Sequence, residues 1–191
     1  MDFVRGFGGV ITGPRGAVLS ALLGTGTPLS GRQIHRLISH KASLTSVQKE
    51  LRELTALGLV KSDKIGASGI HTINEEHALV PPLREMADPF AMLRRIVAES
   101  AGDAQAVLLF GSLAKGEATR DSDIDLAVIG PDDWGGSHHL QESVERSFGN
   151  PCDVLVLTEA QYFSQTEPVA AEIRNDGITL YGEKPLKQGI Q

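Results

Sequence analysis

The fold of the second half of the chain is decided by the stretch FGSLAKGEATRDSDIDL, residues 110–126. The apolar run at residues 106–110 is typical of a buried strand. This strand ends at Gly111, where the missing side chain lets backbone N–H groups approach a ligand closely. Ser112 adds a hydroxyl group, and backbone donors in such a turn can hold phosphate oxygens. The sequence therefore predicts a strand that ends in a phosphate-binding turn.

Two carboxylates follow at the start of the next predicted strand, residues 124–129. Asp123 and Asp125 are two positions apart, and side chains at that spacing on a strand point to the same face. Two such charges repel each other unless a divalent cation lies between them. Because hard oxygen ligands suit Mg²⁺ or Mn²⁺, we expect a metal site here.

A third carboxylate, Asp153, lies in the apolar run at residues 152–157, which has the composition of a central strand. A charge in such a strand is expensive to bury unless it is paired or bound to a metal. If this strand lies beside the strand that carries Asp123 and Asp125, all three carboxylates meet on one face of a sheet. That arrangement suits phosphoryl or nucleotidyl transfer with two metal ions.

Predicted strands and helices alternate along the second half of the chain. Helices are expected at about residues 88–101, 137–148 and 159–175. Strands are expected at residues 106–110, 124–129, 152–157 and 178–181. This order predicts an α/β domain with a mixed sheet at residues 88–184.

The first half of the chain shows three helical patterns. Helices are expected from Pro14 to Gly24, from the Ser-x-x-Gln capping box at Ser30 to about Ser39, and after Ser43. The third helix has an apolar face, which is expected to bury Val47, Leu51, Leu54 and Leu57.

Two strand candidates, residues 59–65 and 70–74, follow these helices, and the glycines between them predict a hairpin. The glycine-rich residues up to Gly13 are expected to form a loosely held arm. The prolines at 81–82 cannot lie inside a helix, so we expect a domain boundary near them. The first domain is accordingly placed at residues 14–80.

The Gly-Ser turn, the Ser-Asp-x-Asp-Leu motif at 122–126 and the later apolar-Asp-apolar strand resemble the signature of the DNA polymerase β-like nucleotidyltransferases. The short form Gly-Ser-x-Ala-Lys-Gly is similar to the minimal nucleotidyltransferases of bacteria and archaea. The resemblance covers about residues 88–183. It implies transfer of a nucleoside monophosphate from an NTP to a hydroxyl group of a macromolecule, either protein or RNA, with Mg²⁺ or Mn²⁺.

The same resemblance implies a role for each matching residue. The implied nucleotide and metal site consists of Gly111, Ser112, Asp123, Asp125 and Asp153. The glycine and the serine would contact the triphosphate, the first two aspartates would bind metal, and the third would act as a metal ligand or a base. Such proteins often carry Arg where Lys115 stands, so Lys115 receives no role.

Residues 30–74 resemble the winged helix-turn-helix domains of bacterial transcriptional regulators, because LRELTALGLV at 51–60 is similar to a recognition helix that runs into the first wing strand. The resemblance implies binding of duplex DNA through this helix and the wing. The residues expected to contact DNA are Ser46, Lys49, Arg52, Lys61 and Lys64. Because Glu50 and Glu53 lie in the same helix, a docking or dimerisation role stays open, and with it a homodimer.

The composition and the charge are those of a globular protein with two unlike halves. Hydrophobic residues make up 41% of the 191 residues and charged residues 22%. Residues 1–85 carry 10 Lys and Arg against 7 Asp and Glu, whereas residues 86–191 carry 8 against 17. A basic module and an acidic module suggest different partners.

The sequence gives no sign of a membrane or an oxidising environment. No apolar run approaches the ~20 residues that cross a bilayer, and the amino terminus lacks the pattern of a secretory signal. Cys152 is the only cysteine, so no internal disulfide forms and the cytoplasm is the expected location.

Three functions remain open on this reading. The main expectation is a metal-dependent nucleotidyltransferase coupled to a DNA-binding winged helix. The first alternative is a transcriptional regulator that uses the nucleotidyltransferase domain as a nucleotide sensor. The second is a component of a toxin–antitoxin pair, as the resemblance to minimal nucleotidyltransferases implies. The identity of the NTP and of the acceptor stays open.

Overall fold

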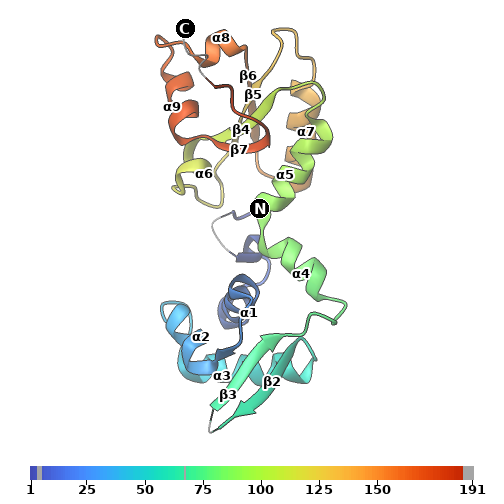
Figure 1. Ribbon diagram of the computed structural model, residues 1–191, viewed down its shortest axis with the longest axis vertical. Helices are drawn as coiled ribbons and strands as arrows, with labels where there is room; N and C mark the ends of the chain where they lie inside the picture. The colour runs from blue at the N-terminus through green and yellow to red at the C-terminus, as the bar shows by residue number, and fades with distance from the viewer. Residues whose placement is uncertain (4–5, 67, 187–191) are drawn as a thin grey trace. The chain divides into compact units, whose positions relative to one another are not determined.

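The structure is a computed structural model that describes residues 1–3, 6–66 and 68–186 (Figure 1). The chain divides into two compact units. Each unit has a hydrophobic core of its own, so we treat the two units separately.

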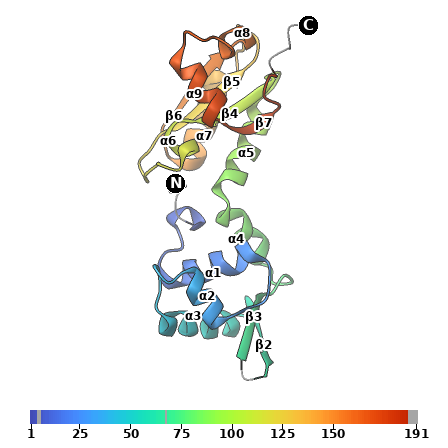
Figure 2. The same ribbon diagram turned by 60° about the vertical axis from the view of Figure 1, so that its left-hand side comes forward.

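The amino-terminal unit, which contains Asp2 and residues 4–89, combines helices with a small antiparallel sheet. Its helices are η1 (Gly6–Gly9), α1 (Gly13–Thr25), α2 (Gly31–Leu37), α3 (Leu44–Ala56) and α4 (Val80–Ala87). Its strands are β1 (Leu29–Ser30), β2 (Val60–Ile65) and β3 (Ser68–Ile73). The sheet order is β1-β3-β2, and Figures 1 and 2 both show the β2–β3 hairpin beside α3. The predicted order of three helices and a hairpin is present.

Side-chain caps fix where α2 and α3 begin. Ser30 forms the predicted capping box with Gln33, in which each side chain binds the backbone N–H of the other residue. Ser43 Oγ accepts a hydrogen bond from the N–H of Ser46 at 3.2 Å at the start of α3. The prediction that Leu57 is buried was wrong, because α3 ends at Ala56 and Leu57 is 58% exposed.

Two further expectations for this unit were wrong. The residues before Gly13 do not form a loose arm where they are described, because Phe7 is 1% exposed and belongs to the core. An isolated aromatic side chain can be buried without any periodic pattern around it. The prolines at 81–82 lie in the first turn of α4. Backbone N–H groups in the first turn have no partner within the helix, so proline loses no hydrogen bond there. The limits 14–80 and 88–184 remain our proposal for the two domains.

The carboxy-terminal unit, which contains Met1, Phe3 and residues 90–191, is built on a four-stranded mixed sheet. Its helices are α5 (Pro89–Ser100), α6 (Gly111–Lys115), α7 (Ser137–Phe148), α8 (Glu159–Tyr162) and α9 (Pro168–Asp176). Its strands are β4 (Ala106–Phe110), β5 (Ile124–Ile129), β6 (Cys152–Leu157) and β7 (Ile178–Gly182). The order is β6-β5-β4-β7, with β5 and β6 parallel and the other pairs antiparallel.

Alternating residues of the strands build a core on each face of this sheet. Val107 and Leu109 pack on the face covered by α5 and α7. Ala106 and Leu108 pack on the opposite face, with Ile173 of α9. Figure 1 shows α7 and α9 on opposite sides of the strands. The sheet is therefore buried on both faces, which explains the continuous apolar runs of β4 and β5.

The single helix expected at residues 159–175 is two helices, α8 and α9. Pro168 explains the break, since it lacks the N–H that would continue a helix and instead occupies the first turn of α9. Across the residues that the structure describes, none of the helices is both long enough and apolar enough to span a membrane.

Candidate active site

The three predicted carboxylates lie at one end of β5 and β6. Asp125 in β5 is the register partner of Asp153 in the parallel strand β6, and Asp123 directly precedes β5. Alternation along β5 puts Asp125 on the same face as Ala127 and Ile129, which belong to the core beneath α8 and α9. The structure thus brings Asp125 and Asp153 side by side on the face that α9 covers.

The setting of Asp153 differs from the expected buried charge. β6 is an edge strand of the sheet, and Asp153 is exposed. The expectation of a central strand was wrong, because an edge strand covered by helices has the same apolar composition as a central one. The case for Asp153 as a site residue therefore rests on its neighbour Asp125 and not on burial.

Asp125 is half-buried, whereas Asp123 and Asp153 are exposed. Burial raises the pKa of Asp125 above its ordinary value, and the charges of Asp153, Asp123 and Glu172 raise it further. Folding therefore favours the protonated carboxyl group, and the folded state loses stability as pH rises from the ordinary pKa toward the raised one. A bound divalent cation would act in the opposite direction, because it favours the ionised form.

The predicted phosphate-binding turn touches this carboxylate. Gly111 begins α6 directly after β4, with a φ of 68° in the left-handed region. A Cβ atom here would collide with Asp125 Oδ2 and lie 3.0 Å from Asp125 Cγ. Gly111 is therefore required both for the backbone conformation and for the space that Asp125 occupies. Ser112 follows in α6 and is half-buried.

The loop before Asp123 is held by an asparagine that sequence analysis missed. Asn150 is buried, and its Nδ2 donates to the carbonyl oxygens of Arg120 (3.2 Å) and Ser122 (3.1 Å). Its Oδ1 accepts from the amino nitrogen of Met1 at 2.5 Å. No sequence pattern indicates this role, because an asparagine after the end of a helix normally suggests a turn.

A fourth carboxylate, Glu172 of α9, also lies near the site. Its charge contributes to the raised pKa of Asp125, and its Oε1 forms an ion pair with Lys115 Nζ at 2.8 Å. Lys115 is thus neutralised by α9 and does not pair with the aspartates of β5. Glu172 carries no signal in the sequence, because only the packing of α9 on the sheet brings it near residues about fifty positions earlier.

The donor set fits a hard divalent cation by residue type, since all of its side chains are carboxylates. As they stand, however, no three carboxylate, imidazole or thiol groups within the described ranges are close enough together to hold a metal ion. Asp123 and Asp153 are exposed and have room to turn toward Asp125. The set therefore fits an ion whose binding draws these side chains together.

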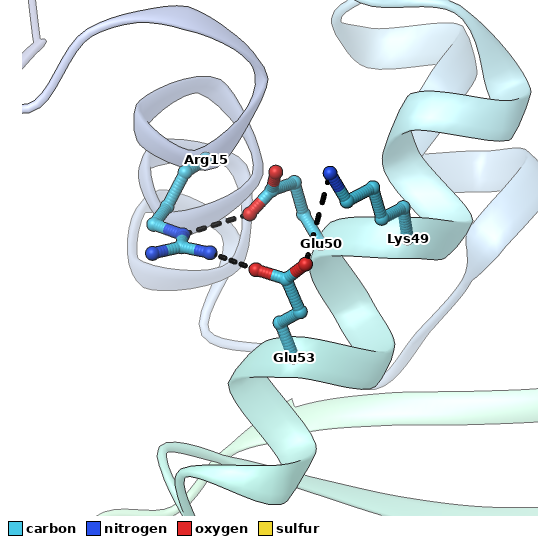
Figure 3. A network of polar contacts seen from close by, with 4 residues as sticks. All are labelled: Arg15, Lys49, Glu50 and Glu53. Atoms are coloured by element: carbon cyan, nitrogen blue, oxygen red, sulfur yellow. Dashed lines mark hydrogen bonds and ion pairs between the residues drawn. The ribbon is translucent and has the colours of Figure 1, made fainter.

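The residues predicted to contact DNA differ in how their charges are used. Lys49 Nζ lies 3.8 Å from Glu53 Oε1, and Figure 3 shows that Glu53 and Glu50 also bind Arg15. Lys61 Nζ lies 2.9 Å from Glu76 Oε2. These two lysines are therefore partly neutralised within the unit.

The charges of the other predicted DNA contacts are not neutralised in this way. Arg52 and Lys64 are exposed and form no ion pair among the residues that the structure describes. Ser46 is half-buried, and its backbone N–H is bound to Ser43 in the cap of α3. Arg52 and Lys64 are thus the two predicted contacts whose charge remains available.

A comparison with protein families gives one match. Residues 94–185 match the family model described as Polymerase beta, Nucleotidyltransferase. These residues include the whole sheet, the turn at Gly111 and the three aspartates. None of the curated proteins with which the chain was compared matches it. Residues 94–185 therefore form a nucleotidyltransferase domain of the polymerase β family.

Solved structures give weaker likenesses. A toxin–antitoxin crystal structure with AMP-PNP contains a chain that is 21% identical, with a TM-score of 0.41 over 50% of this chain and 75% of that chain. A tri-AMPylated Shewanella oneidensis HEPN toxin in complex with MNT antitoxin gives 20% identity and a TM-score of 0.36, over 49% and 70% of the two chains. At this level the likenesses indicate nothing about the partner of the present protein.

Proposed function

We propose that the carboxy-terminal unit transfers a nucleoside monophosphate from an NTP to a hydroxyl group of a macromolecule, in the presence of Mg²⁺ or Mn²⁺. One observation carries the proposal. Asp125 is the strand partner of Asp153 and at the same time fills the space beside Gly111. A phosphate-binding turn and a pair of carboxylates therefore meet at one point of the sheet.

Each residue of the site has a separate task in this proposal. The backbone at Gly111 and the hydroxyl group of Ser112 bind the triphosphate. Asp123 and Asp125 hold the metal, which when bound neutralises the phosphates and lowers the pKa of the attacking hydroxyl. Asp153 completes the donor set and receives the proton of that hydroxyl. The acceptor oxygen bonds to the α-phosphorus while the bond to the pyrophosphate oxygen breaks.

The exposure of Asp153 on an edge strand supports a large acceptor. β6 has β5 on one side and no strand on the other within the described sheet, so the exposed Asp153 lies at the edge of the sheet. A protein or an RNA could approach this edge without the site having to enclose it. We therefore favour a macromolecule over a small metabolite as the acceptor.

The test is transfer of label in a cell extract. The protein is incubated with each of the four NTPs, labelled on the α-phosphate, in Mg²⁺ and separately in excess chelator. We expect one macromolecule to acquire label from one preferred NTP, only with the metal. Digestion with protease or with ribonuclease then identifies the acceptor as protein or RNA. Label that persists in chelator would contradict the proposed role of the metal.

The two alternatives relate differently to this assay. A regulator that uses the domain as a sensor would bind NTP but transfer no label. A toxin–antitoxin component would give the expected transfer, with one specific partner protein as the labelled acceptor.

For the amino-terminal unit we infer a winged helix that binds duplex DNA. The order α1, α2, α3 and the β2–β3 hairpin supports this, together with the available charges of Arg52 and Lys64. Lys49 and Lys61 would have to exchange a carboxylate for a phosphate, so we expect them to contribute less.

Anisotropy titration of the full chain with pooled genomic duplex tests this inference. Arg52→Ala should weaken binding and lower the slope of log affinity against log salt by about one unit. Arg94→Ala, at an exposed arginine of the other unit, serves as the matched control and should change neither. Absence of binding at low salt would assign the unit to protein docking or dimerisation.

A further inference from the structure

The amino-terminal unit contains a pocket of about 740 Å³, and Arg52 alone of its lining residues is also a proposed DNA contact. One face of α3, the β2–β3 hairpin and the start of α2 line this open pocket, and Figure 1 shows these elements together. Gln48, Leu51, Arg52 and Thr55 line it from α3, at the spacing of a single helix face. Its volume is within the range of about 300–1,000 Å³ that small-molecule sites occupy.

The charge of this pocket is positive and uncompensated. Arg32 of α2 and Arg52 of α3 both line it, and its described lining contains no Asp or Glu. Neither arginine forms an ion pair with any residue that the structure describes, whereas Arg15, Lys49 and Arg84 of the same unit are each paired. Two exposed arginines from different helices thus line one pocket.

A chain of hydrogen bonds orients a third donor toward the same space. Thr55 Oγ1 lies 2.9 Å from Ser62 Oγ, which lies 2.8 Å from His71 Nδ1. If Thr55 donates to Ser62 and Ser62 donates to His71 Nδ1, then Nδ1 is the acceptor and the imidazole proton lies on Nε2. Nε2 can then donate a hydrogen bond to a ligand. A Cβ atom at Gly69 would lie in van der Waals contact with this nitrogen, 3.5 Å away, so a branched side chain there would crowd it. The φ of Gly69 is not in the left-handed region, so the backbone itself does not require glycine.

We propose that this pocket binds a small phosphorylated molecule, with a phosphate monoester as the recognised group. A monoester carries a charge of about −1.5 to −2 near neutral pH, which matches two guanidinium groups better than a carboxylate does. Arginine presents paired N–H donors that fit phosphate oxygens. The remaining volume of the pocket accommodates the rest of the molecule.

Calorimetry on the full chain in excess chelator tests the proposal, with AMP as the probe and adenosine as the matched compound without phosphate. We expect AMP to bind and adenosine to give no measurable heat. The double variant Arg32→Gln, Arg52→Gln should weaken AMP binding at least about tenfold, since a hydrogen bond to a charged group contributes more than a tenfold change requires. Arg36→Gln, at an exposed arginine of α2 outside the pocket, should bind AMP like the wild type.

A second variant separates loss of the site from loss of the fold. Gly69→Val places a residue suited to a strand over His71 and keeps both arginines, so it should lose AMP binding with unchanged circular dichroism. AMP binding that survives both the double variant and Gly69→Val would place the ligand elsewhere and overturn the proposal. A 20-base-pair duplex is titrated in parallel. If AMP does not bind but the double variant weakens duplex binding, the arginines serve a nucleic-acid surface and the small-molecule site is wrong.

Discussion

The two units of the protein leave charges of opposite sign uncompensated. In the carboxy-terminal unit, Asp125 and Asp153 lie side by side, and Lys115 is occupied by Glu172. In the amino-terminal unit, the two arginines of the pocket have no carboxylate partner within the described residues, although other basic residues of that unit are paired.

This contrast shows which charges point to a ligand. A paired surface charge contributes little to stability and indicates little about function. Like charges that lie close together and lack a partner in the chain make a site a candidate for binding a ligand of opposite charge. The carboxylates predict a cation and the arginines predict an anion.

The largest effect is expected at the carboxylates. Asp123→Ala combined with Asp125→Ala should reduce transfer by about 1000-fold or more, because both proposed metal ligands are removed. Asp121→Ala, at an exposed aspartate of the preceding loop, is the matched control and should transfer normally. Trp134, the only tryptophan and a buried residue of this unit, reports its folding by fluorescence. A folded double variant that still transfers label would disprove the assignment of the site.

The next effect concerns the turn that touches Asp125. Gly111→Ala should destabilise the carboxy-terminal unit by about 3 kcal/mol, which combines left-handed backbone strain with overpacking against the carboxylate. In an Asp125→Ala background the collision with Oδ2 disappears, so the same change should cost about 1–2 kcal/mol. Urea unfolding, monitored by Trp134 fluorescence, measures the free energy of unfolding in both backgrounds. Equal costs in the two backgrounds would show that Gly111 is needed for backbone conformation alone.

A smaller effect is expected from the metal itself. Mg²⁺ at about 100 times its Kd should stabilise the wild-type unit by about 2.7 kcal/mol. Asp123→Asn combined with Asp125→Asn should melt at a higher temperature than the wild type in chelator, because like charges are removed, and should not respond to Mg²⁺. The transition of Trp134 fluorescence is the measurement. A wild-type protein that also ignores Mg²⁺ would leave the carboxylates without their proposed ion.

Local patterns were enough to predict most elements of this fold. The capping box at Ser30 and the apolar run of β5 are signals that a few neighbouring residues determine. Residues joined only by packing could not be predicted. Glu172 reaches the site because α9 covers one face of the sheet, and Asn150 holds a loop about thirty residues earlier in the chain. Asp153 was placed in the right strand but in the wrong environment, because composition does not distinguish an edge from a centre.

The smallest effect is expected at the pocket of the amino-terminal unit. Burial lowers the pKa of His71 below its ordinary value of 6.5, so folding favours the neutral imidazole. As pH falls below 6.5 the unfolded chain binds a proton that the folded unit resists, and this unit should lose stability from about that pH downward. His71→Gln should reduce the loss, whereas His40→Gln, at an exposed histidine outside the pocket, should leave it as in the wild type. Calorimetric melting at pH 7 and pH 5.5 measures the difference, with Trp134 fluorescence identifying the transition of the other unit.

The same measurement with AMP tests whether His71 faces a ligand. A phosphate monoester in the pocket should reduce the loss of stability at low pH, because a protonated His71 would add a third cation beside the two arginines. A loss of stability that AMP does not reduce would indicate that His71 is buried for packing and does not face a ligand.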